Sequence, residues 1–297
     1  MVRFRMVAVL ALVLAAATGC VKVPAGVDRD LVDEWTMMGE AKVAEPRAGD
    51  CWATKADNVI TLISTSLSLV QTPCDLSHVA ETVHVGHFTG ALADADQAPD
   101  LADLADTYAV CDAELTKFLG GSWQVGRLRM LLYAPTSRQW KGGARFFRCD
   151  VAALRSERGI LDPRTETMKD ALQAGGDMLL GCGTRIESGA SWTDVDPQAC
   201  TAPHDVEFVG NVTSVSAVYP TDTKTRTAAW STGCLNRIRS YTGSTDSVLA
   251  KAKTAYGFWP LAVGEPEWKA GNRNARCYIS LPKKVTRSLK NNGKAAI

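Results

Sequence analysis

A cysteine, a histidine and a glutamate recur in this chain at the same spacing in two places. The stretches "CDLSHVAETV" and "CTAPHDVEFV" both have the pattern C-x3-H-x2-E, and their residues are Cys74, His78, Glu81 and Cys200, His204, Glu207. An imidazole beside a carboxylate can act as a general acid–base pair, and a thiol beside an imidazole can bind zinc or act as a nucleophile. A third interpretation is structural, in which each histidine and glutamate fix a turn that leads into a strand.

The spacing of the cysteines argues against the first two interpretations. Zinc sites commonly use closely spaced C-x2–4-C pairs, and the sequence has no such pair. A Cys-His hydrolase needs a free thiolate, and a serine hydrolase often carries G-x-S-x-G, which is also absent from the sequence. We therefore predict no catalytic residue, no metal, no cofactor and no enzymatic activity. A peptide- or sugar-binding spot remains open, so candidate binding residues include His78, Glu81, His204 and Glu207.

The amino-terminal stretch MVRFRMVAVLALVLAAATGC has the composition of an export signal. Its apolar run, residues 6–18, is shorter than the roughly 20 residues that span a bilayer. The ending Ala17-Thr18-Gly19-Cys20 resembles a bacterial lipobox, in which the cysteine is acylated with diacylglycerol and becomes the first residue. This predicts a signal peptide over 1–19, a lipid on Cys20 and a tether over 20–48. The alternative is an ordinary secretory cut beside a chance cysteine.

The charge balance excludes one class of partner. The chain has 33 Lys and Arg against 32 Asp and Glu, and removal of 1–19 takes away Arg3 and Arg5, leaving 31 against 32. This near-zero balance lacks the basic excess that nucleic-acid binding requires, so we predict no nucleic-acid partner. We expect the protein at the extracytoplasmic face of the cell membrane, held by the lipid.

The eight other cysteines form two groups of four in matching sequence contexts. Exported thiols tend to oxidise, so an even number predicts four disulfides. Eight cysteines allow 105 pairings, and two modules that fold alike and independently leave three patterns. Of these we predict first-to-second and third-to-fourth, because the latter bond would tie a helix to the last strand. The predicted pairs are Cys51–Cys74, Cys111–Cys149, Cys182–Cys200 and Cys234–Cys277.

The matching contexts indicate an internal duplication. In each group the second cysteine precedes a predicted strand, and the third lies on a helix that ends at a glycine. The fourth ends one of two similar peptides, "WKGGARFFRC" and "WKAGNRNARC". The predicted fold class is α+β, with two tandem modules that each have a small antiparallel sheet and one packed helix. The predicted bounds are 49–150 and 178–284, with a linker over 151–177 and a tail over 285–297.

The two similar peptides supply a second set of candidate binding residues. A tryptophan beside basic residues in a hairpin loop can stack on a partner or pack inside its own module. Tryptophan with arginine is also a composition typical of interfaces. The candidates are Trp140, Arg145, Trp268 and Arg273.

Together these motifs resemble the septum-formation domain of actinobacterial envelope proteins. The resemblance rests on "GDCW" at 49–52, on C-x3-H-x2-E and on W-x-x-G-x-R-x3-C, and it covers most of 49–150 and 178–282. It implies a lipid-anchored or membrane-tethered extracytoplasmic protein linked to cell division, without a known reaction. One departure is that Gly183 follows Cys182, where Trp52 follows Cys51 in the first copy.

We therefore expect a lipid-anchored interaction or scaffold protein of the cell envelope, linked to septum formation or cell division. Its partners would be the membrane, through Cys20, and an unknown envelope protein or cell-wall component. The alternative is an extracytoplasmic enzyme or cell-wall ligand-binding protein with a His/Glu cleft. The location of the two imidazoles separates these hypotheses, because a cleft must expose them.

Overall fold

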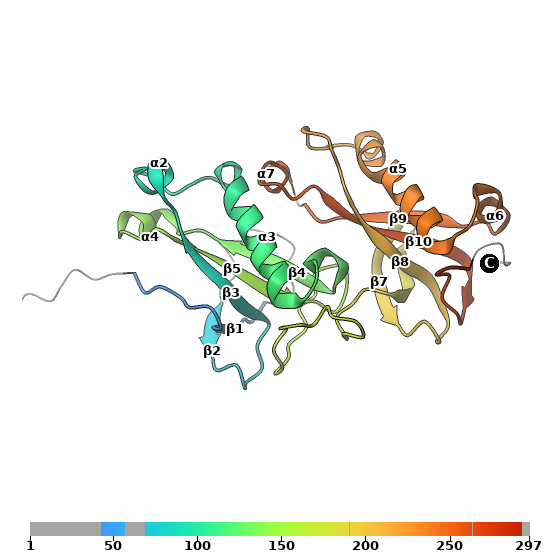
Figure 1. Cartoon of the computed structure of the whole chain (residues 1–297), viewed down its shortest axis with the longest axis horizontal. Coiled ribbons are helices and arrows are strands. Elements are labelled where there is room, and N and C mark those ends of the chain that lie inside the picture. Colours follow the sequence, from blue (N-terminus) through green and yellow to red (C-terminus); the bar gives the residue numbers. More distant parts are fainter. Residues whose placement is uncertain (1–42, 57–68, 190, 263, 293–297) are drawn as a thin grey trace, which may run out of the picture. The chain divides into compact units, whose positions relative to one another are not determined.

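The structure is a computed structural model that describes residues 43–56, 69–189, 191–262 and 264–292. The predicted signal peptide, Cys20 and most of the tether lie outside the described residues. The described residues form two five-stranded antiparallel sheets with helices packed on them, a mixed α+β fold as predicted (Figure 1). Each sheet, with its helices, makes up one module.

The first sheet has the strand order β2-β1-β3-β5-β4. In chain order the elements of this module are β1 (Cys51–Ala53), β2 (Val70–Thr72), β3 (Ala80–His87), α2 (Gly90–Ala93), the 3-10 turn η1 (Leu101–Asp103), α3 (Ala105–Leu119), the 3-10 turn η2 (Trp123–Val125), β4 (Leu128–Tyr133), α4 (Ser137–Lys141) and β5 (Phe146–Ala153).

The second sheet has the order β7-β6-β8-β10-β9, which is the same topology. Its module contains β6 (Cys182–Ser188), β7 (Ser191–Gln198), β8 (His204–Thr213), α5 (Thr223–Thr242), α6 (Asp246–Lys251), β9 (Ala255–Pro260), α7 (Glu265–Lys269) and β10 (Asn274–Val285). The strand register makes positions in the two modules equivalent. For example, the β3–β5 pair has a register shift between Thr82 and His84, just after Glu81. The β8–β10 pair has one between Phe208 and Gly210, just after Glu207.

One long helix covers one face of each sheet, α3 in the first module and α5 in the second (Figure 1). The buried stripe of α3 includes Tyr108, Cys111 and Leu115, at the three- and four-residue spacing of one helix face. Both helices end at a glycine in the left-handed conformation, Gly120 (φ 73°) and Gly243 (φ 67°). Glycine adopts this conformation without the steric cost of a Cβ, so it ends the helix where the sequence predicts.

The eight cysteines form the predicted disulfides, Cys51–Cys74, Cys111–Cys149, Cys182–Cys200 and Cys234–Cys277. The bond of each third cysteine ties the long helix to an interior strand, β5 in the first sheet and β10 in the second. Each bond adds about 3–4 kcal/mol to stability by restricting the unfolded chain. That contribution is large for a module of this size, because small cores bury limited apolar surface.

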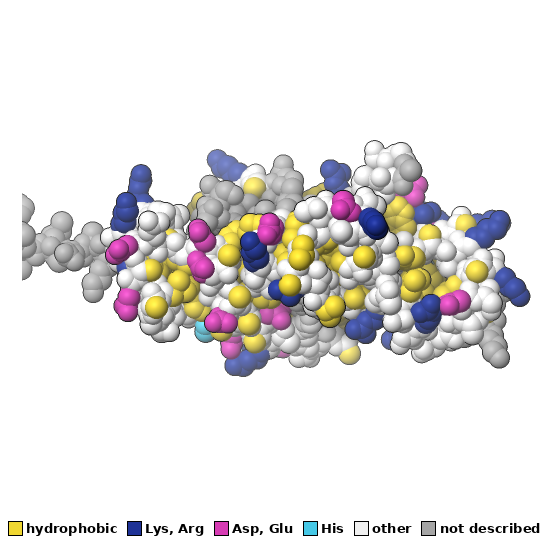
Figure 2. Space-filling view, turned by 90° about the horizontal axis from the view of Figure 1, so that it is seen from above, with side chains coloured by type: hydrophobic (Ala, Val, Ile, Leu, Met, Phe, Trp, Pro, Cys, Tyr) yellow, Lys and Arg dark blue, Asp and Glu magenta, His cyan; other side chains and the backbone are white. Residues whose placement is uncertain are grey.

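The helices and one face of the molecule were compared with what a membrane or a highly charged partner would need. No helix among the described residues is both long enough and apolar enough to cross a bilayer. On the face seen in Figure 2, acidic and basic side chains are interspersed among apolar ones. That face therefore has no extended field of one sign.

Candidate functional site

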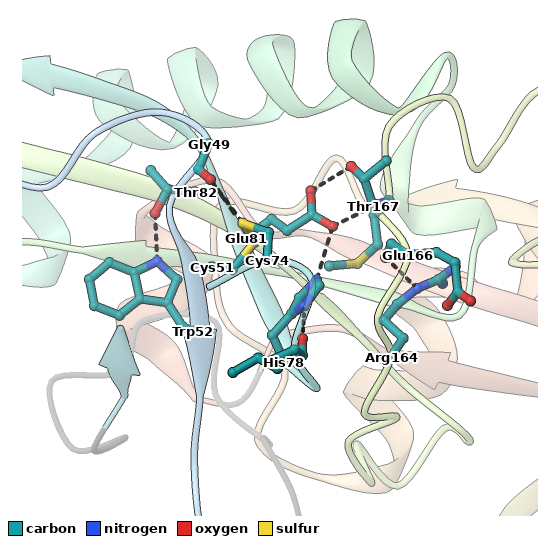
Figure 3. Close-up of a disulfide and its surroundings, with 12 residues drawn as sticks. Gly49, Cys51, Trp52, Cys74, His78, Glu81, Thr82, Arg164, Glu166 and Thr167 are labelled. Carbon is teal, nitrogen blue, oxygen red and sulfur yellow. Dashed lines mark hydrogen bonds and ion pairs between the residues drawn. A yellow bond between two sulfur atoms is a disulfide. The ribbon is translucent and has the colours of Figure 1, made fainter. Parts of the chain in front are cut away.

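The His/Glu pair of the first module lies at the start of β3, beside the Cys51–Cys74 disulfide (Figure 3). His78 is 1% exposed and Glu81 is 5% exposed. The Nδ1 atom of His78 lies 2.9 Å from the carbonyl oxygen of Leu76, and Nε2 lies 3.5 Å from Oε1 of Glu81. The imidazole thus joins the disulfide-bound turn to the strand.

The pair of the second module has the same arrangement with shorter distances. His204 and Glu207 are 0% and 1% exposed. Nδ1 of His204 lies 2.8 Å from the carbonyl oxygen of Ala202, and Nε2 lies 3.0 Å from Oε1 of Glu207. A carbonyl oxygen only accepts hydrogen bonds, so Nδ1 carries a proton in both modules. Nε2 of each ring faces the carboxylate of the same pair.

A short segment after the fourth cysteine closes each site. In the first module the Thr167 hydroxyl and the Met168 backbone N–H both donate to Glu81, each at 2.7 Å. In the second module the Ser288 hydroxyl donates to Glu207 at 3.0 Å, and the Leu289 N–H donates to it at 2.8 Å. These segments come from the regions that the sequence analysis places in a linker and a tail.

The closing segments are a further part of the duplication that the sequence analysis missed. Their sequences, Thr-Met-Lys-Asp at 167–170 and Ser-Leu-Lys-Asn at 288–291, are similar in type but share only the lysine. Asp170 and Asn291 both have a positive φ, 60° and 56°, and they donate their N–H groups to the equivalent helix carbonyls of Phe118 and Tyr241. The sequence signal for this repeat is the aspartate or asparagine at the matched position, since these residues tolerate the left-handed conformation.

This geometry gives the pairs a structural role. The oxygens of Glu207 also accept from the Tyr241 hydroxyl, and burial raises the pKa of that hydroxyl to about 12. Buried polar groups that are fully paired stabilise a unique packing, whereas an acid–base catalyst must reach its substrate. His78, Glu81, His204 and Glu207 are all buried and bonded within their own module, so none of the four lines an exposed cleft in the described part of the chain.

The second module also contains a cluster of metal-ligand types. The ligand atoms of Cys182, His204 and Glu207 lie within 4.8 Å of one another, the one such group among the described residues. Zinc binds the thiolate form of cysteine, and the sulfur of Cys182 is bonded to Cys200. The oxidised protein therefore offers only two of the three ligands.

The tryptophans of the repeated peptides are also buried. They lie on the one-turn helices α4 and α7 instead of in open hairpin loops. Trp140 donates Nε1–H to the Ala95 carbonyl at 2.7 Å, and the Arg145 guanidinium stacks 3.9 Å from its ring centroid. Trp268 packs edge-on against Trp230, and Arg273 lies 6.0 Å from its ring. These contacts pack both tryptophans into the core of their own module.

A third arginine, Arg276 on β10, connects the two modules. Its guanidinium donates to the carbonyls of Gln124, Gly126 and Leu128 at 2.7–2.9 Å. It also forms a buried ion pair at 2.8 Å with Glu157, which accepts a hydrogen bond from Tyr278. The sequence does not reveal these partners of Arg276, because they are 119 to 152 residues away in the chain.

The equivalent residue of the first module, Arg148, lies in an open groove of about 600 Å³. Its guanidinium lies between two aromatic rings, 3.9 Å from the Trp52 centroid and 4.2 Å from that of Tyr133. It pairs with Asp150 at 2.8 Å, and Thr82 donates to the same carboxyl group. Burial raises the pKa of Asp150 to about 7, although the Arg148 charge opposes this effect.

The comparisons with known proteins agree with the repeated motifs. The septum-formation family model matches residues 48–277, a single match that runs through both modules. No curated protein and no solved structure matches the chain. The disulfides suggest an extracytoplasmic location, which agrees with the resemblance inferred from the motifs. Because the match covers most of its length, the chain belongs to the septum-formation family.

Proposed function

We propose that this protein is a non-enzymatic interaction or scaffold protein at the extracytoplasmic face of the cell membrane. A lipid on Cys20 holds it there, and its role lies in septum formation or cell division. The partner is an envelope protein, and neither nucleic acid nor a cofactor takes part.

The observation that carries this proposal is the closure of the duplicated polar sites. Both histidines, which an enzyme or cleft binder would need, are almost fully buried and bonded within their own modules. Each site is also closed by a segment of the same module. A sheet face with an exposed groove remains in the first module, and such a face suits binding more than catalysis.

The location follows from two further features. Disulfides persist in oxidising compartments, and each module depends on two of them. The lipobox-like end of the leader supplies the membrane anchor. An acylated amino-terminal cysteine carries two or three chains, which is enough for stable anchoring, whereas a single chain binds only marginally.

The test uses the full chain in its own host. We expect the tagged wild type in the membrane fraction and enriched at division sites, whereas Cys20→Ser should lose the membrane association. Depletion should alter septum placement or cell length. Unchanged septa after depletion, together with a uniform distribution of the tagged chain, would remove the division role.

A second comparison separates scaffold from enzyme. The variants His78→Gln and His204→Gln keep a polar side chain at each site, and those that fold should restore normal septa. Folding is checked by the urea midpoint. A folded His204→Gln protein that fails to restore septa would favour catalysis or ligand binding at the pair.

A further inference from the structure

Three side chains of metal-ligand type meet at one point on the second sheet. Cys182 of β6 lies opposite Glu207 of β8 in the strand register, so their side chains share one face of the sheet. His204 stands three residues before Glu207, and its Nε2 lies 3.0 Å from Oε1 of that glutamate. With the sulfur of Cys182, these atoms all lie within 4.8 Å of one another. Ligand atoms around a tetrahedral zinc ion are about 3–4 Å apart, so movements of about 1 Å bring them into range.

The surroundings of these ligands match those of a structural metal site. Nδ1 of His204 donates to the Ala202 carbonyl at 2.8 Å, which directs Nε2 toward the glutamate. Metal-binding histidines typically have their second nitrogen fixed in this way. Glu207 accepts from the Ser288 hydroxyl and the Leu289 N–H at 3.0 and 2.8 Å. Both side chains are therefore oriented before an ion arrives, and their burial matches the closed form of structural zinc sites.

The disulfide beside them lies at the wall of a hollow. Cys182 and Cys200 both line this hollow, which has a volume of about 380 Å³, and Cys200 is only partly buried. The hollow gives a reductant and a metal ion one route to this bond. The disulfides of the long helices differ, because all four of their cysteines are 0% exposed. A reductant acting on the folded protein therefore meets Cys182–Cys200 before it meets those two bonds.

We propose that reduction of the Cys182–Cys200 bond converts this cluster into a zinc site. A dithiol transfers two electrons and two protons to the bond, which yields two thiols in the protein and a disulfide in the reductant. Zn²⁺ then binds both sulfurs as thiolates, Nε2 of His204 and a carboxylate oxygen of Glu207, and the two thiol protons pass to the solvent. This ligand set selects zinc over magnesium and calcium, which prefer oxygen ligands. The ion holds the turn at Cys200 to β6 in place of the disulfide.

The first module supplies an internal comparison. Cys51, His78 and Glu81 are the equivalent residues, but their ligand atoms do not form such a group in the described part of the chain. Nε2 of His78 is 3.5 Å from Oε1 of Glu81, and the sulfurs of Cys51 and Cys74 lie 4.0 and 3.3 Å from the Gly49 carbonyl oxygen (Figure 3). A carbonyl oxygen repels a thiolate, since both carry negative charge. The inference therefore concerns the second module alone, and it does not depend on the interaction role proposed above.

The first test titrates zinc into the mature full-length chain before and after mild reduction with a phosphine. The chain carries Cys20→Ser, so that this cysteine adds no thiol, and a chromophoric chelator competes for the metal. We expect one zinc ion per reduced chain and none in the oxidised chain, with magnesium unable to displace it. Co²⁺ in place of zinc should give a thiolate-to-cobalt charge-transfer band. In the reduced chain, His204→Gln should weaken zinc binding more than about tenfold, whereas the matched variant His78→Gln should not change it.

The second test needs no reductant. Cys200→Ser leaves Cys182 as a free thiol and retains the other three disulfides. This variant should bind zinc through the three ligands that remain, with water in the fourth position. The matched control is Cys74→Ser, which frees Cys51 in the first module and should bind no zinc. Circular dichroism reports the fold of each variant with and without the metal.

Four results would overturn the inference. They are no zinc binding by folded Cys200→Ser, equal binding by Cys74→Ser, equal binding by the oxidised wild type, and unchanged affinity in reduced His204→Gln. A variant that is unfolded without metal must gain secondary structure when zinc is added, because binding then drives folding, and the absence of that gain also counts against the site. None of these results alters the proposed function, which is tested by location and septum phenotype.

Discussion

Replacing Arg276 with alanine tests whether the two modules are joined by one buried arginine. The variant loses an ion pair to Glu157 and three hydrogen bonds to carbonyls, all in a site where both charged side chains are at most 3% exposed. Leaving one charge of a buried pair without its partner costs about 3–5 kcal/mol. A hollow of about 380 Å³ adjoins the pair, so water can reach the uncovered carboxylate. We therefore expect the lower end, about 3 kcal/mol.

The assay is equilibrium unfolding in urea, followed by tryptophan fluorescence and by circular dichroism. The matched control is Arg155→Ala, which breaks an exposed pair with Asp162 and should cost about 0–1 kcal/mol. Adding Glu157→Gln to Arg276→Ala should recover part of the loss, because it removes the unpaired charge. If Arg276→Ala costs no more than the control, the buried pair does not hold the modules together and the reasoning fails.

Three further predictions concern single side chains. Glu207→Gln should lower the free energy of unfolding by about 2–4 kcal/mol. Glu81→Gln should lower it by less, because the imidazole of His78 is 3.5 Å away instead of 3.0 Å and no tyrosine of the described residues donates to Glu81; equal losses in urea would contradict this. Burial raises the pKa of Asp150 from 3.8 to about 7, so the folded state keeps a proton that the unfolded chain has released. Stability should therefore fall as the pH rises from about 4 to about 7, and the fall should be smaller in Asp150→Asn; parallel pH profiles would rule this out. Removing the Cys234–Cys277 bond by a double serine substitution should cost about 3–4 kcal/mol, whereas iodoacetamide should label no disulfide cysteine of the unreduced wild type; labelling would refute the pairing.

The duplication explains how much of the fold could be predicted. Each cysteine motif occurs in both modules, which makes a chance resemblance less common. The matched spacing of the motifs therefore predicted the long helices, the strands next to the cysteines and the disulfide pairing. The cysteine at the third position shows this clearly. Cys111 lies on the buried stripe of a helix that ends at a glycine, and its bond to β5 was the expected one.

The rest could not be predicted because it depends on tertiary context. A tryptophan next to lysine and glycine is compatible with an exposed loop and with a buried one-turn helix. Trp140 and Trp268 lie on buried one-turn helices. The closing segments are short and irregular, so no periodicity distinguishes Thr167 or Ser288 from linker residues. Arg148 and Arg276 look equivalent in the sequence, and only their spatial neighbours separate an interface from a groove.

The differences between the copies form a consistent set. Trp52 can stack on Arg148, but its equivalent Gly183 has no room for a side chain, since a Cβ there would lie 2.6 Å from Val195 and 2.8 Å from the Asp196 carbonyl oxygen. At the position of Asp150 the second module has a tyrosine, which leaves Arg276 to pair with Glu157 of the first module. The second copy therefore lacks both the tryptophan beside the arginine and the internal carboxylate, and Arg276 has its carboxylate partner in Glu157 instead. The first copy has both within its own module, so the charge of Arg148 is balanced without a neighbouring module.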